Sequence, residues 1–230
     1  MSPERFARIT QMLNSRQPEL TLFLEHVHKP HNLAAIVRTA DAIGLSTVHA
    51  TWETQSSRVL GATATGSQHW VDIISHDTTE QAIQNFRDQG MQIIATNLAD
   101  DAFDFRDVNY TKPTAILMGQ EKHGLSDVAS ALADRNIIIP MKGMCQSLNV
   151  SVASALILYE AQRQRQNAGM YDGECKLSKA QQHKILFEGG HPIFTKLCRK
   201  KGLKYPPLDE QGQINASGSW WDMMRFTNTD

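Results

Sequence analysis

An α/β fold with a parallel sheet is the architecture that this 230-residue sequence predicts. Segments rich in strand-forming residues alternate with segments whose apolar residues have helical spacing. Several strand segments, such as Ala115–Met118 and Ile137–Pro140, are continuous apolar runs, which is typical of strands buried on both faces. The hydrophobic content of 41% is sufficient for a substantial core.

The first elements of this fold are a helix and a strand. Apolar residues at helical spacing predict a helix over residues 3–15, and the strand-forming run LTLFLEHV predicts a strand over 20–27. After a His-Lys-Pro-His break, Asn32 is expected to cap a helix that runs to about Ile43 and that Gly44 ends. Residues 46–51 form the next expected strand.

The same alternation continues to about residue 167. The remaining expected elements are helices at 78–89, 126–133 and 147–165 and strands at 91–98, 114–118 and 136–140. Beyond Asn167, glycines and prolines divide the tail into short helices and loops. We therefore expect an N-terminal helical extension at 1–19, an α/β domain at 20–167 and a C-terminal extension at 168–230.

Charge is distributed unevenly along the chain. The net charge is −1, but residues 161–230 carry 11 Lys and Arg against 7 Asp and Glu, a net charge of +4. The densest cationic stretch contains Lys196, Arg199, Lys200, Lys201 and Lys204. Five cations in nine residues suit a nucleic-acid backbone, although a solvated helix face explains the same pattern.

The N-terminal sequence, the lengths of the apolar segments and the cysteine spacing are typical of an intracellular protein. The N-terminus lacks the apolar region of a signal peptide, and no segment has the length of a membrane span, so we expect a cytoplasmic protein without a membrane partner. Cys145, Cys175 and Cys198 are widely spaced and odd in number, which predicts free thiols rather than disulfides or a thiolate metal site.

Functional residues are expected in the loops after the strands, because ligands of open α/β sheets bind beyond the carboxyl ends of the strands. The loop HKPHN leads to Asn32 and, on the following helix, to Arg38, which lies off the apolar stripe. The loop Gly119–Leu125 contains two glycines, and the loop after Pro140 ends in Ser147, Leu148 and Asn149. Taken singly, these residues also fit helix caps, a turn and a surface charge.

Three other site types are disfavoured by spacing. The segment Gly61–Ser67 has the glycine separation of a P-loop but lacks its lysine. His26, His28 and His31 have no suitably spaced partner to complete a zinc site, and the GxSxG motif of α/β-hydrolases is absent from the sequence. We therefore expect neither a nucleotide triphosphatase nor a metal enzyme.

The three loops together resemble the three motifs of the SPOUT superfamily, in its SpoU/TrmH ribose methyltransferase branch. The matching segments are NLAAIVRTADAIG, ILMGQEKHGLS and IIIPMKGMCQSLNVSVASALILYE. The resemblance implies a parallel-sheet fold with a deep C-terminal trefoil knot, which is an exception to the rule that chains avoid knots. It also implies a homodimer and S-adenosyl-L-methionine as methyl donor, without a metal.

By motif position, the resemblance also implies the roles of individual residues. Arg38 matches the catalytic arginine, Asn32 and Asn149 are supporting polar residues, Ser147 lies beside the donor, and Glu121 matches the glutamate of the second motif. The donor is expected to contact Thr96, Met118, Gly119, Ile139 and Leu148. Guanidinium keeps its proton at ordinary pH, so we expect Arg38 to stabilise a developing ribose alkoxide rather than to act as a general base.

The two extensions resemble those of the branch members that methylate guanosine-18 in the tRNA D-loop. The resemblance covers the N-terminal helix, with Arg5, Arg8 and nearby Arg16, and the tail LFEGGHPIFTKLCRKKGLKYPPLDEQGQI. It favours tRNA as a partner, bound by Arg5, Arg8 and the five cations of residues 196–204. Two alternatives are methylation of another tRNA or rRNA site and RNA binding without catalysis.

Overall fold

The computed structural model describes residues 1–52, 67–99 and 102–225. The chain forms two compact units, one from Arg16–Gly173 and one from Met1–Ser15 with the described part of Glu174–Asp230. The glycine-containing segment 61–66 lies outside the described residues. None of the described helices is long and apolar enough to cross a membrane.

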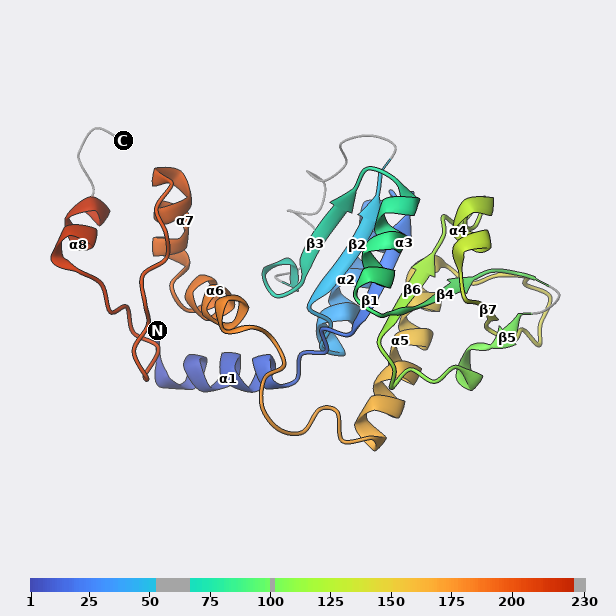
Figure 1. Ribbon diagram of the computed structural model, residues 1–230, viewed down its shortest axis with the longest axis horizontal. Helices are drawn as coiled ribbons and strands as arrows, with labels where there is room; N and C mark the ends of the chain where they lie inside the picture. The colour runs from blue at the N-terminus through green and yellow to red at the C-terminus, as the bar shows by residue number, and fades with distance from the viewer. Residues whose placement is uncertain (53–66, 100–101, 226–230) are drawn as a thin grey trace. The chain divides into compact units, whose positions relative to one another are not determined.

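The larger unit is built on a seven-stranded sheet in which every strand pair is parallel, as the sequence predicts (Figure 1). The sheet order is β3-β2-β1-β6-β4-β7-β5. The strands are β1 (Leu20–Glu25), β2 (Thr47–Thr51), β3 (Asp72–His76), β4 (Gln92–Thr96), β5 (Phe103–Asp104), β6 (Thr114–Met118) and β7 (Arg135–Ile138). Strands β3 and β5, at the two edges, are absent from the sequence prediction.

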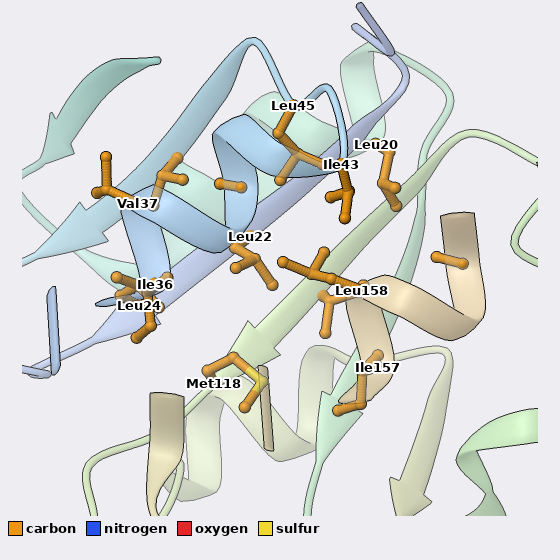
Figure 2. Close-up of a cluster of buried hydrophobic side chains, with 14 of the residues drawn as sticks. Leu20, Leu22, Leu24, Ile36, Val37, Ile43, Leu45, Met118, Ile157 and Leu158 are labelled. Carbon is orange, nitrogen blue, oxygen red and sulfur yellow. The ribbon is translucent and has the colours of Figure 1, made fainter. Parts of the chain in front are cut away.

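The central strands carry apolar side chains on both faces of the sheet, and helices cover both faces. On one face, Leu22 and Leu24 of β1 belong to the core formed with α2 (Pro30–Ala42) and α5 (Val150–Asn167) (Figure 2). On the other face, Phe23 belongs to the core formed with α3 (Thr79–Asp88) and α4 (Asp127–Leu132). Each central strand is thereby fixed in register, and its carboxyl end is held in place.

The starts of two helices differ from the sequence prediction, and both differences affect functional residues. Helix α2 begins at Pro30 with Lys29 as its N-cap residue, so the prediction that Asn32 caps this helix is wrong. Proline suits a first helical turn because its φ is already helical and its missing N–H has no partner there. Helix α5 begins at Val150 rather than Ser147, and the Asn149 side chain caps it by accepting from the Ser151 amide.

Arg16, which follows helix α1 (Pro3–Asn14), is fully buried in the larger unit. Its guanidinium donates to the Leu45 carbonyl at 2.6 Å and to Asp41 Oδ1 at 2.8 Å. Burial of an arginine requires such partners because an unpaired buried charge is costly. Arg16 therefore lies apart from the exposed arginines Arg5 and Arg8 that are expected to bind RNA.

The smaller unit joins the two ends of the chain. It contains α1 (Pro3–Asn14), α6 (Lys179–Gly190), α7 (Pro192–Lys201) and α8 (Gly218–Met224). Phe187, Cys198, Trp220 and Met224 form its core, and the N-terminal ammonium donates to Gln213 Oε1 at 3.0 Å. The short helices confirm the prediction of a tail divided by glycine and proline. All three cysteines are free, as expected.

A buried histidine pair should make the stability of the larger unit pH-dependent. His49 Nδ1 lies 2.7 Å from His76 Nε2, and burial, with a smaller contribution from the charge of His76, lowers the pKa of His49 to about 4. The unfolded chain therefore takes up this proton first as pH falls from about 6.5 to 4. Stability present above pH 6.5 is lost on acidification, by about 2 kcal/mol between pH 7 and pH 5.

Urea unfolding of the protein and of His49→Leu at these two pH values measures this loss. Between pH 7 and pH 5, the loss in free energy of unfolding should be about 2 kcal/mol smaller in the variant than in the unsubstituted protein. Equal losses in the two proteins would show that His49 is not the titrating group.

Candidate functional site

A pocket with a volume of about 400 Å³ lies at the carboxyl ends of the central strands. All five residues expected to contact the donor line it: Thr96, Met118, Gly119, Ile139 and Leu148. Thr96 ends β4 and Met118 ends β6, while Ile139 and Leu148 come from the segment between β7 and α5. Glu121 and Ser147 also line the pocket. The second and third sequence motifs thus meet around one cavity.

The first residue of the Gly119–Leu125 loop has no room for a side chain. A Cβ on Gly119 would lie 2.1 Å from the backbone carbon of Gly124. The Gly124 amide donates to the Gln120 carbonyl at 2.8 Å, and Gly124 has a φ of +68°, which favours glycine. The loop therefore folds back on itself at the wall of the pocket.

Replacing Gly119 by alanine should lower the free energy of unfolding by about 1–3 kcal/mol, because backbone atoms of the loop must move apart. Gly143→Ala is the matched control, since a Cβ on Gly143 meets nothing within 4 Å. Urea unfolding of the two variants checks this. Equal midpoints would contradict the close approach at Gly119.

The carboxylate of Glu121 connects the three motifs. Glu121 Oε1 accepts hydrogen bonds from the side-chain amides of Asn32 and Asn149, both at 2.8 Å. Asn149 also donates to Asn32 Oδ1 at 3.1 Å. Glu121 Oε2 accepts from the Lys29 ammonium, with which it forms an ion pair. One side chain from each motif, with Lys29, therefore forms a single polar cluster at the pocket.

This cluster keeps Glu121 ionised. The hydrogen bonds from Lys29 and Asn32, in this order of importance, hold the pKa of Glu121 below its usual value. The folded-state pKa is depressed, so the contribution of the cluster to stability is present above the ordinary carboxyl pKa and is lost only as pH falls through the lower value. The network therefore persists at neutral pH.

The predicted catalytic residues occupy different positions relative to this cluster. Asn32 is 2% exposed and lies within it, and Asn149 both caps α5 and belongs to it. Ser147 is exposed and lines the pocket two residues before the cap. Arg38 is exposed on α2 and is not among the described residues that line the pocket. Four of the five predicted catalytic residues therefore lie at the pocket or in the adjoining polar cluster of one chain, and Arg38 does not.

Two further residues support this arrangement and were missed by sequence reasoning. Lys29 precedes Pro30, where no helix start was expected. No pattern in the sequence therefore predicted that Lys29 would lie beside Glu121. Glu25, at the end of β1, is buried and accepts hydrogen bonds from Thr79 Oγ1 at 2.5 Å and from the Ser126 amide at 2.7 Å. It thereby fixes the chain directly after the Gly119–Leu125 loop.

The residues expected to bind RNA are exposed in the smaller unit. Arg5 and Arg8 lie on α1, and Arg5 Nε donates to the Gly189 carbonyl at 2.7 Å. The five cations of residues 196–204 lie on α7 and just after it. Arg199 forms an ion pair with Glu188 at 2.9 Å, and the Lys201 ammonium donates to the Met223 carbonyl. Lys196 and Lys204 are exposed beside them.

Metal-binding side chains do not gather at the pocket or elsewhere in the described ranges: no group of three or more His, Cys, Asp or Glu residues there could hold an ion.

Comparison with known proteins covers most of the chain. Residues 19–159 match the model of the SpoU rRNA Methylase family, and residues 163–217 match the model described as "SpoU, rRNA methylase, C-terminal". The tRNA (guanosine(18)-2'-O)-methyltransferase of Escherichia coli (strain K12) is 56% identical over 226 residues, which are 98% of this chain and 99% of that protein. The Thermus thermophilus protein of the same name is 53% identical and is covered over 87% of its length by 73% of this chain.

Solved structures of SpoU methyltransferases are also similar to this chain. The A. aeolicus TrmH/SpoU tRNA modifying enzyme has a TM-score of 0.76 and 41% sequence identity, covering 82% of this chain and 96% of that chain. The SpoU methyltransferase AviRb from Streptomyces viridochromogenes, in complex with the cofactor AdoMet, has a TM-score of 0.60 and 26% identity, covering 66% of this chain and 62% of that chain.

Proposed function

Because the chain belongs to the SpoU rRNA Methylase family, we propose that it transfers a methyl group from S-adenosyl-L-methionine to the ribose 2′-oxygen of guanosine-18 in the tRNA D-loop. The observation that carries this proposal is the identity of 56% with a tRNA (guanosine(18)-2'-O)-methyltransferase over almost the whole of both chains. That match includes both extensions as well as the motif residues around the pocket. We place this reaction in the cytoplasm, together with its tRNA substrate.

The pocket has the chemistry that the methyl donor needs. Met118, Ile137 and Ile139 give it apolar walls suited to an adenine face, and the loops that contain Gly119 and Leu148 carry backbone groups suited to an adenine edge. S-adenosyl-L-methionine, when bound, supplies a methyl group on a positively charged sulfur. Apolar walls exclude water, which favours a reaction in which that charge disappears. The residues present therefore fit the donor.

The polar cluster is proposed to position the reacting groups. With its carboxylate ionised, Glu121 orients the Asn32 and Asn149 amides at the side of the donor pocket, and Ser147 lies on the wall between Gln146 and Leu148. Arg38 is proposed to stabilise the developing alkoxide of the ribose, with an RNA phosphate or water as the final proton acceptor. No metal takes part in this proposed reaction.

We further propose a homodimer, with Arg38 acting at the pocket of the partner subunit. Helix α5 exposes an apolar stripe at i, i+4 and i+7, in which Val152 is 47%, Leu156 43% and Tyr159 55% exposed. This stripe begins two residues after Val150, which lines the pocket, so a second copy packed on it would approach the site. A trefoil knot in the segment after β6, which the family resemblance implies, also belongs to the proposal.

The function is tested with two tRNA transcripts and labelled donor. A transcript with guanosine at position 18 should accept one methyl group, whereas the same transcript with 2′-deoxyguanosine at that position should accept none. Methylation of the deoxy transcript would contradict the proposed acceptor. Calorimetry tests the alternative of a non-catalytic RNA-binding protein, which should release no heat with S-adenosyl-L-methionine.

The five cations of residues 196–204 are proposed to bind the tRNA backbone, and this gives a separate prediction. Lys196→Gln with Lys204→Gln should weaken tRNA binding and reduce the slope of log K against log salt by about two, because each phosphate contact releases about one counterion. Lys179→Gln, an exposed lysine at the start of α6, is the control. Binding measured at several salt concentrations checks this, and an unchanged slope would favour a solvated helix face.

A further inference from the structure

A second cavity, of about 440 Å³, adjoins the donor pocket. The two cavities share the residues Gln120–Lys122 and Val150. The second cavity is completed by the loop between β1 and α2, which contains His26, His28 and Lys29. Glu121 therefore lies in the wall common to the two cavities, at the carboxyl edge of the sheet.

His26 has an unusual conformation in this cavity. Its φ of +55° is the only positive value among the described residues other than glycine. Its backbone amide donates to the Thr51 carbonyl, and its side-chain Nδ1 is buried without a hydrogen-bond partner in the described part of the chain. A left-handed backbone conformation and a buried nitrogen without a hydrogen bond are both unfavourable. Such features cluster at functional sites.

The charges around His26 favour an anion. Lys29 and Lys122 contribute two positive charges, and Glu121 contributes one negative charge that its ion pair with Lys29 compensates. Lys122 is exposed, and no ion pair with a described residue involves it. The His26 imidazole and the Lys122 side chain therefore line a cavity whose carboxylate is already paired with Lys29, which suits a phosphate oxygen.

We infer that this second cavity binds the phosphodiester on the 3′ side of the methylated ribose, through the His26 imidazole and the Lys122 ammonium. The inference rests on the proposed function. In RNA the 2′-oxygen and the 3′-phosphate are on adjacent ribose carbons, so a ribose placed at the donor pocket puts this phosphate a short distance away. The adjoining position of the two cavities meets that requirement. Binding this phosphate holds the tRNA beside the donor pocket.

The variants His26→Asn and Lys122→Gln test this subsite. Asparagine tolerates positive φ better than most residues, so the first substitution removes the imidazole with little backbone strain. Lys112→Gln is the matched control for Lys122→Gln, because Lys112 is also exposed but precedes β6 at the amino end of the sheet. Rates are measured with the guanosine-18 transcript at saturating S-adenosyl-L-methionine, and donor binding is measured by calorimetry.

Each of the two variants should raise the KM for tRNA about fivefold or more, while the kcat and the donor Kd stay within about twofold of the unsubstituted protein. A transcript with an uncharged methylphosphonate linkage 3′ to guanosine-18 should raise the KM of the unsubstituted protein and of Lys112→Gln. The same linkage should cause little further change in the KM of Lys122→Gln. In this variant the contact between the phosphate and the Lys122 ammonium, which the uncharged linkage weakens, is already absent.

Three outcomes would overturn the inference or its premise, and they are distinguishable. A KM equal to that of Lys112→Gln in both variants, or an undiminished effect of the uncharged linkage in Lys122→Gln, would refute the phosphate subsite. A raised donor Kd with an unchanged KM for tRNA would assign the cavity to the donor carboxylate instead. Absence of methylation at guanosine-18 by the unsubstituted protein would refute the proposed function itself.

Discussion

Replacing Glu121 by glutamine should lower kcat about a hundredfold, because reacting groups displaced by about 1 Å lose that much rate. The carboxylate accepts from Asn32 and Asn149 through one oxygen and from Lys29 through the other. A glutamine side chain has a single acceptor oxygen, so its NH₂ group must face either the ammonium or the two amides. The cluster would therefore separate on at least one side.

Single-turnover rates with bound donor measure this effect without a contribution from product release. Glu80→Gln is the control, because Glu80 is exposed in the first turn of α3, away from the pocket residues. Its rate should equal that of the unsubstituted protein. An unchanged rate in Glu121→Gln would mean that the cluster stabilises the fold but does not position the reacting groups.

Replacing Arg38 by lysine should lower kcat by about 10²–10³, because an ammonium group does not reproduce the paired donors of a guanidinium at a developing oxyanion. Arg38 is exposed on α2, so its replacement should leave the thermal unfolding temperature nearly unchanged. The measurement is a single-turnover rate at saturating tRNA. Near-normal turnover in the lysine variant would refute a specific role of the guanidinium.

Mixed dimers test whether Arg38 acts on the partner subunit. Arg38→Ala and Glu121→Gln are each expected to lose at least about a hundredfold in kcat. If Arg38 serves the partner's pocket, a hybrid of the two variants contains one site with both residues intact, and co-refolded mixtures recover activity. If Arg38 serves the pocket of its own chain, each site of the hybrid lacks one residue and the mixture is no more active than the two variants.

The sequence predicts the central strands because burial on both faces leaves a pattern of uninterrupted apolar residues. Strands β1 and β6 are buried along their whole length, and both were predicted within two residues. Strand β3, with the sequence DIISH, is an edge strand with three exposed residues and shows neither a continuous run nor a clear alternation. Strand β5 has two residues, too few for any pattern.

The site was predictable only in part for a similar reason. Residues around the pocket follow strand ends, and the family resemblance implied Thr96, Met118 and Gly119 as residues of this site by their motif positions. The Glu121 cluster joins side chains that are 89 and 28 residues away along the chain, and such contacts leave no local pattern. Asn32 was expected as a helix cap because a cap is the commonest local use of asparagine before an apolar stripe.

The central claim is that this chain methylates one ribose in tRNA, and the direct test is to identify the labelled nucleotide. The protein is incubated with labelled S-adenosyl-L-methionine and total small RNA, and the label is then mapped by nuclease digestion. The account predicts label as 2′-O-methylguanosine at position 18 of tRNA. Label at the wobble nucleotide or on a base, or label that appears only in ribosomal RNA when that is supplied, would contradict it.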